Sequence, residues 1–125
     1  MASGKGDGLR FFAVMDADGV DQQLLATQHV TLVTYRDLAA VVAPAPYVRA
    51  KPSDADLAEY LRVLDALHVH GPFIPAPAGT VFRDESVLLR WLDVHYAKLH
   101  EALGIIERRE DGRAPYEYVR MELGA

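Results

Sequence analysis

Apolar and polar residues follow two different periods along this chain, and together they predict strands toward both ends with helices between them. Leu9–Met15 (LRFFAVM) is a short run rich in aromatic and branched residues, which is typical of a buried strand. His29–Tyr35 (HVTLVTY) alternates, so its even-numbered residues would lie on one face of a second strand and its odd-numbered residues on the other.

A third strand is predicted over Leu38–Val42, directly after a tight Arg36-Asp37 connection. Pro44 and Pro46 are expected to end it, because proline has no backbone N–H to donate to a neighbouring strand.

The first helix is predicted to begin after Ser53, a good N-cap, with Asp56 in the position of a capping-box acid. Gly71-Pro72 is expected to stop it. Its inner face is predicted to consist of leucines at helical spacing with Tyr60 beside them. These leucines are Leu57, Leu61, Leu64 and Leu67.

The second helix is predicted to start near Asp84 and to end at Gly104, a natural C′ residue. One continuous apolar stripe would form its inner face. The stripe consists of Leu88, Trp91, Leu92, His95, Leu99 and Leu103.

Two more strands, Ile105–Glu110 and Tyr116–Glu122, are predicted around an Asp111-Gly112 hairpin turn. Strands at both ends with helices between them describe an α+β fold, expected here as a two-layer sandwich. It would have a mainly antiparallel sheet of about four to five strands and two main helices on one face. Residues 9–125 would form this single domain, after a disordered lead over residues 1–8.

Composition narrows the classes of function. The chain has 125 residues, no cysteine and a net charge of -5. The absence of cysteine excludes disulfides, thiolate metal sites and cysteine nucleophiles. Nucleic-acid binding needs a basic face, so an acidic chain is not expected to have a nucleic-acid partner. The sequence contains no apolar run long enough for a membrane span and no signal-peptide pattern, which predicts a cytoplasmic protein.

Asp16, Asp18 and Asp21 (DADGVD) superficially suggest a calcium loop. The EF-hand pattern needs an acid at its fifth position and glycine at its sixth, where this chain has Val20 and Asp21. A solvated turn after the first strand explains these aspartates better.

No catalytic residue, metal site or cofactor is predicted, so the chain is not expected to be an enzyme. The candidate nitrogen ligands diverge in direction on a helix, and no acidic second shell accompanies them. They are His68, His70, His95 and His100. The serines lie in the tail, at a helix cap and in a first helical turn, with no positioned base. They are Ser3, Ser53 and Ser86.

The unusual stretch is Gly71–Phe82 (GPFIPAPAGTVF), which contains three prolines, two phenylalanines and no charge between two helices. One interpretation is an extended segment that crosses the core and buries its large apolar side chains. They are Phe73, Ile74, Val81 and Phe82. The other interpretation is a stiff apolar surface on which an apolar partner docks.

Three motifs in this order resemble the gas vesicle protein F/L family. They are the aromatic strand Phe11–Val14, the DLAAVV strand Asp37–Val42, and the pair Gly71–Pro75 and Gly79–Phe82. The resemblance covers roughly residues 9 to 103. This part of the chain is similar to the N-terminal domain of family members, which are commonly about twice as long. Where the family usually carries Leu-Arg-Phe before Gly-Thr, this chain has Ala76-Pro77-Ala78.

The resemblance implies a non-enzymatic accessory protein of gas vesicle formation, located in the cytoplasm and at the gas vesicle. Its partners would be the hydrophobic shell protein and other vesicle accessory proteins. An apolar groove or a strand edge could hold the apolar face of a shell subunit. The candidate partner-binding residues are Pro72, Phe73, Ile74, Pro75, Gly79, Thr80, Val81 and Phe82.

Two alternatives stay open at this point. The first is an enzyme or a small-molecule-binding domain on a generic α+β scaffold. The second is a diverged paralogue that acts as a homo-oligomer or a regulator through a strand edge.

Overall fold

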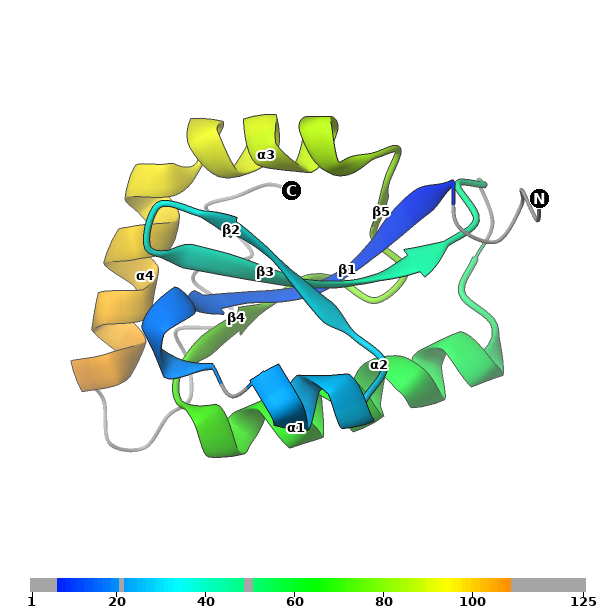
Figure 1. Ribbon diagram of the computed structural model, residues 1–125, viewed down its shortest axis with the longest axis horizontal. Helices are drawn as coiled ribbons and strands as arrows, with labels where there is room; N and C mark the ends of the chain where they lie inside the picture. Colours follow the sequence, from blue (N-terminus) through cyan, green and yellow to red (C-terminus); the bar gives the residue numbers. More distant parts are fainter. Residues whose placement is uncertain (1–6, 21, 49–50, 109–125) are drawn as a thin grey trace.

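A computed structural model describes residues 7–20, 22–48 and 51–108, and it places a five-stranded antiparallel sheet at the centre (Figure 1). The strand order is β2-β3-β1-β4, and β5 also pairs with β1. This confirms the α+β class and the mainly antiparallel sheet. The strands are β1 (Gly8–Asp16), β2 (Thr31–Tyr35), β3 (Leu38–Ala45), β4 (Phe73–Pro75) and β5 (Val81–Phe82).

Helices cover both faces of the sheet, with α3 and α2 on opposite sides of it in Figure 1. Side chains of α2 and α1 share one core with the sheet, whereas side chains of α3 and α4 share the other. The expected two-layer sandwich with both main helices on one face is therefore wrong. The helices are α1 (Gln22–Thr27), α2 (Asp54–Leu67), α3 (Glu85–Val94) and α4 (Tyr96–Arg108), with short 3-10 turns η2 (Ala17–Gly19) and η3 (His68–His70).

The reason for two covered faces lies in β1 and β3. Every residue from Phe11 to Met15 and from Leu38 to Ala43 is buried, whichever side of the sheet it points to. A strand that is apolar on both faces must be covered on both. By contrast β2 alternates as predicted: Leu32 packs against the α2 core, and Val33 and Tyr35 against the α3–α4 core.

α2 begins at the predicted place but is rotated relative to the prediction. Ser53 and Asp56 form the expected capping box, with Ser53 Oγ accepting from the Asp56 N–H at 3.1 Å. Val63 and Leu67 are its fully buried residues. Leu57 and Leu61, predicted to lie inside, are 38% and 63% exposed.

The predicted second helix is two helices that meet at His95, where the backbone leaves helical geometry (φ -102°, ψ 12°). α4 then continues through Gly104 to Arg108, so the predicted helix end at Gly104 is wrong. Residues 105–108 are helical, which contradicts the strand predicted from Ile105. The strand predicted at Tyr116–Glu122 and its turn lie outside the described residues.

Two boundaries of strands also differ from the prediction. β1 begins at Gly8, inside the predicted lead, whereas residues 1–6 lie outside the described part. β3 passes through Pro44, which pairs with Leu9 of β1. Pairing of β3 with β2 stops at Val42, so Pro44 has a strand on one side only, where a missing N–H is tolerated.

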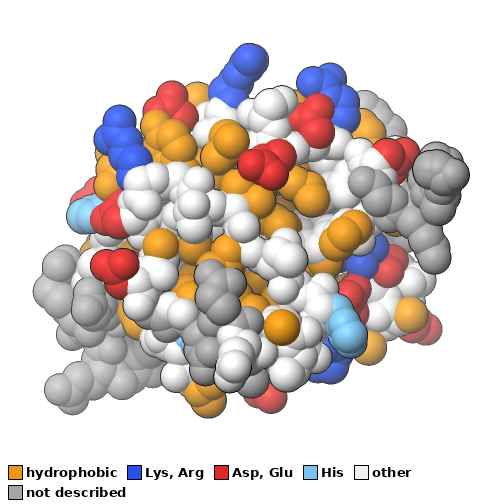
Figure 2. All heavy atoms as spheres, in the orientation of Figure 1, with side chains coloured by type: hydrophobic (Ala, Val, Ile, Leu, Met, Phe, Trp, Pro, Cys, Tyr) orange, Lys and Arg blue, Asp and Glu red, His pale blue; other side chains and the backbone are white. Residues whose placement is uncertain are grey.

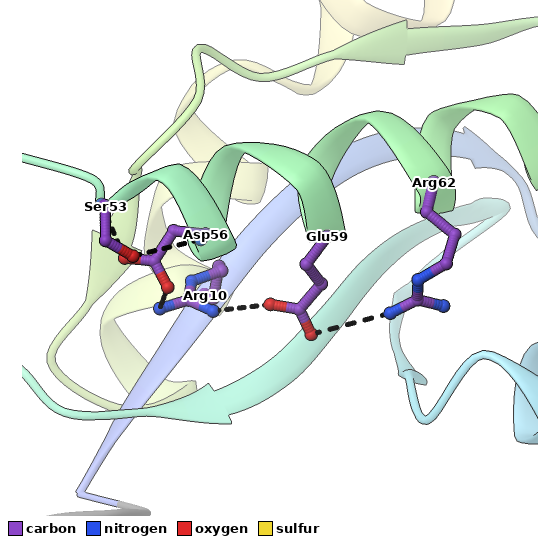
Figure 3. Close-up of polar contacts among 5 residues, drawn as sticks. All are labelled: Arg10, Ser53, Asp56, Glu59 and Arg62. Carbon is purple, nitrogen blue, oxygen red and sulfur yellow. Dashed lines mark hydrogen bonds and ion pairs between the residues drawn. The ribbon is translucent and has the colours of Figure 1, made fainter.

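Arg10 of β1 is joined to α2 through two carboxylates of that helix (Figure 3). Its guanidinium donates to Glu59 Oε1 at 2.7 Å and lies 3.2 Å from Asp56 Oδ1. The Arg10 side chain is 17% exposed, so its ion pairs with the two carboxylates are only partly screened by water. Arg62, one helical turn beyond Glu59, also donates to the side-chain oxygen of Gln28, the residue that follows α1.

Candidate partner-binding surface

The 71–82 segment is built into the sheet along β1. β4 pairs antiparallel with the second half of β1, where Val14 faces Ile74. β5 pairs with the first half, where Arg10 faces Val81. The segment is thus extended, as predicted, and it consists of two short strands that both pair with β1.

A tight turn between the two strands is fixed by a bulge in β1 and by a glycine. The β1 register shifts at Phe12, whose carbonyl accepts the Ala76 N–H at 2.9 Å. Thr80 closes the turn, because its N–H and hydroxyl both donate to the Pro77 carbonyl. Gly79 has φ +88°, and a Cβ there would lie 3.2 Å from Pro52. Glycine is therefore required at this position.

The eight candidate residues differ in exposure. Ile74 is only 4% exposed and belongs to the core beneath α3 and α4. Gly79 is exposed, and the other six are half-buried. Ile74 therefore fits the buried interpretation, and its side chain has no surface to offer a partner. The half-buried residues are Pro72, Phe73, Pro75, Thr80, Val81 and Phe82.

Phe82 is half-buried because it belongs to an aromatic cluster. Its ring centroid lies 5.6 Å from that of Phe11 and 5.9 Å from that of Trp91. Phe11 and Trp91 meet edge-on at 5.4 Å, a geometry that aromatic pairs favour. These contacts hold β5 to α3, so Phe82 contributes to the fold.

The opposite end of the segment runs alongside α2. The Tyr60 hydroxyl donates to the Ala76 carbonyl at 2.6 Å, and the rings of His68 and Phe73 lie 5.1 Å apart. Because Pro52, just before α2, lies beside Gly79, the segment passes α2 in the antiparallel direction.

Leu57 and Leu61 project from the flank of α2 that borders this segment. They precede Leu64 at helical spacing, and Leu64 packs into the same core as Tyr60 and Phe73. The polar contacts of α2 with Arg10 and Gln28 occupy its other flank. The exposed leucines therefore extend the candidate surface, although their spacing in the sequence predicts that they lie in the core.

A second polar cluster lies where the β2–β3 turn meets α3 and α4. The Tyr96 hydroxyl donates to Asp37 Oδ1 at 2.6 Å, and His100 Nε2 lies 3.2 Å from Asp37 Oδ2. The Tyr96 hydrogen bond is the main reason that the pKa of Asp37 is lowered. Tyr35 donates in the same way to Asp93 of α3.

Arg36 occupies the turn in the left-handed region (φ 54°) and stacks on both tyrosines. Its guanidinium carbon lies 5.4 Å from the Tyr35 ring centroid and 5.0 Å from that of Tyr96. These contacts are exposed and tie elements together. Their arrangement supplies no nucleophile with an adjacent base.

Within the described ranges, no group of three or more His, Cys, Asp or Glu side chains could hold a metal ion. No helix in the part of the chain that the structure describes is long and apolar enough to cross a bilayer. The four histidines considered above lie apart in elements η3, α4 and the α3–α4 junction.

Comparison with known proteins gives two matches. The family model of the gas vesicle synthesis protein GvpL/GvpF matches residues 10–112. The crystal structure of the gas vesicle protein GvpF from Anabaena sp. PCC7120 is similar in fold, with a TM-score of 0.64 at 20% sequence identity. That match covers 81% of this chain but 44% of the Anabaena protein, so this chain spans less than half of its length. No curated protein matches the sequence.

Proposed function

Because this chain belongs to the gas vesicle synthesis protein GvpL/GvpF family, we propose that it is a non-enzymatic accessory protein of gas vesicle formation. Its role would be to bind the hydrophobic shell protein, or another vesicle protein, during assembly at the vesicle in the cytoplasm. The family is not known for enzymes. In this role residues 9–125 would act as one α+β domain that is sufficient for the contact.

One observation supports the location of the contact. Leu57 and Leu61 are exposed on the flank of α2 that continues from Tyr60 and Leu64, and these two residues share a core with Phe73 of the half-buried segment. Leucines exposed next to one another on a helix are unfavourable in water unless something covers them. We name the α2–β4 surface as the set Leu57, Leu61, Phe73 and Pro75.

An apolar partner fits this surface for a physical reason. A shell subunit exposes an apolar face until it packs into the vesicle wall, and burial of apolar area is the main driving force for such association. The net charge of -5 keeps the chain soluble while it holds that face.

The test is co-expression with the shell protein, measured as shell protein recovered in the soluble fraction with this chain. Leu61→Glu should reduce recovery at least tenfold, because it places a charge in the contact. Val94→Glu is the matched control, since Val94 is 68% exposed on α3, across the sheet from α2. Both variants should keep the melting temperature of the parent chain.

Equal recovery with Leu61→Glu, Val94→Glu and the parent chain would refute this surface. No recovery with the folded parent chain would refute shell-protein binding by this domain. Ile74 is unsuitable for the test because a charge in the core would unfold the chain.

A further inference from the structure

β2 forms one edge of the sheet, and its outer side presents an unusually unprotected strand. In the strand order β2 has a neighbour, β3, on one side only, and no described backbone group pairs with its other side. Its sequence TLVTY carries no charge, no proline and no glycine. Natural sheets normally blunt such an edge with charges, proline or a bulge.

The other edge is protected. β4 is three residues long and ends in Pro75. The Tyr60 hydroxyl of α2 also donates to the Ala76 carbonyl, just after β4. β2 is therefore the edge that invites another strand.

Figure 2 shows the face of the molecule on which β2 is the nearest strand in Figure 1. Among the described residues, hydrophobic side chains and white atoms (other side chains and backbone) gather in the middle of this face, and most Lys, Arg, Asp and Glu side chains lie toward its rim. Such a pattern is typical of the centre and rim of a protein–protein interface.

From these observations we infer that two copies of this chain associate edge to edge through β2, antiparallel and with the two-fold axis at Val33. The two sheets then form one continuous sheet of ten strands. This contact is separate from the α2–β4 surface and does not depend on it.

The backbone of β2 is suited to this register. Tyr35 and Leu38 flank a two-residue turn, so they form a hydrogen-bonded pair. Hydrogen-bonded and non-hydrogen-bonded pairs alternate along antiparallel strands, so the backbone groups of Val33 and Thr31 also bond to β3. The N–H and C=O groups of Leu32 and Thr34 consequently point outward. With the axis at Val33, Leu32 of one copy faces Thr34 of the other, and all these outward groups pair at once.

Charge also agrees with the two-fold register. The residues that would pair, Thr31–Tyr35 of each copy, carry no charge. No like charges stand opposite one another, whereas opposed like charges would weaken a strand pair. This self-complementarity argues for a second copy of the chain as the occupant, rather than a strand of a different protein.

Cysteine cross-linking tests the register directly, because the chain has no other cysteine. Val33→Cys places two thiols at the axis, where the Cα atoms of a non-hydrogen-bonded pair lie about 4.5 Å apart, within disulfide range. Thr31→Cys is the matched control on the same face of the strand. It is more exposed than Val33, but its Cα would lie about 14 Å from its symmetry mate.

We expect covalent dimer with Val33→Cys at least ten times faster than with Thr31→Cys on mild oxidation. If Thr31→Cys cross-links equally fast or faster, random collision explains the result and the inference is wrong.

Sedimentation of the unmodified chain over a range of concentrations tests the association itself. The parent chain should show a monomer–dimer equilibrium that Thr34→Pro shifts to monomer at least tenfold. The Thr34 N–H points outward, so this proline leaves the β2–β3 pairing intact, and circular dichroism should be unchanged. If the parent chain stays monomeric at every concentration, the inference is wrong. It is wrong in that case even if β2 binds the shell protein instead.

Discussion

Burial divides the apolar side chains of this chain into two groups. Ile74 is 4% exposed and packs with Leu88 and Leu92 of α3, whereas Leu61 and Val94 are more than half exposed. The first group holds the fold, and the second is free to change without unfolding the chain. Substitutions at single residues should separate the two.

Ile74→Ala should lower the free energy of unfolding by about 3 kcal/mol, because it removes buried methylene groups and leaves a cavity. Leu61→Ala should change it by less than about 0.5 kcal/mol. Urea unfolding followed by circular dichroism measures both. A cost at Leu61 as large as that at Ile74 would show that Leu61 is covered in solution.

Arg10 is a second residue with a testable role. Arg10→Ala should lower the free energy of unfolding by about 2 kcal/mol, because Asp56 and Glu59 then lose a shared, partly buried partner. Arg10→Met keeps the apolar stem, so it separates the loss of charge from the loss of packing. Arg90→Ala, at an exposed position on α3, is the control and should have almost no effect.

At the scale of elements, carboxylates mark the helix starts. The backbone N–H of Ser53 donates to Asp56 in the capping box at the start of α2 and is the main cause of the lowered pKa of Asp56. At the start of α3 the Ser86 hydroxyl and the Val87 N–H donate to Asp84 and lower its pKa.

These shifts predict a loss of stability in acid. Each carboxyl has a folded-state pKa below its ordinary value of 3.8. It therefore stabilises the fold above that value, and this contribution is lost as the pH falls through the lower folded-state pKa. The urea midpoint should fall when the pH drops below about 4. In Asp84→Asn, where asparagine still caps the helix, the fall should be smaller. An identical fall would argue against this role of Asp84.

The elements differ in how far local sequence determines them. The start of α2 was predictable because Ser53 and Asp56 make a contact within one helical turn. The break at His95 was not, since no proline or glycine marks it. Contacts from distant residues hold the two helices there: Tyr96 bonds Asp37, and Tyr35 bonds Asp93. Such contacts leave no local pattern in the sequence.

The candidate site shows the same limit. The composition of the 71–82 segment is unusual, but its pairing with β1 depends on residues 58 to 73 positions away in the chain. Leu57 and Leu61 were assigned to the core because a stripe of leucines normally faces it. In the structure Val63 and Leu67 take that role, so the helix is turned and the two leucines lie at its flank.

At the scale of the whole molecule, β1 is the central strand, with more strand neighbours than any other described strand. It pairs with β3, β4 and β5 and has a core on each face. Opening β1 would therefore break most of the sheet at once. We expect the amides of β1 and β3 to exchange with deuterium most slowly, at rates set by global unfolding. Faster exchange there than in α2, measured by mass spectrometry or NMR, would contradict this.

The central place of β1 also matters while the protein is being made. β1 leaves the ribosome before the other described strands, and β4 and β5 are encoded far downstream of it. At about 5–20 residues per second, this apolar strand waits for seconds before its partners exist. During that interval the unpaired apolar strand exposes the nascent chain to aggregation. The order of the strands along the chain thus makes β1 the segment that most needs protection during synthesis.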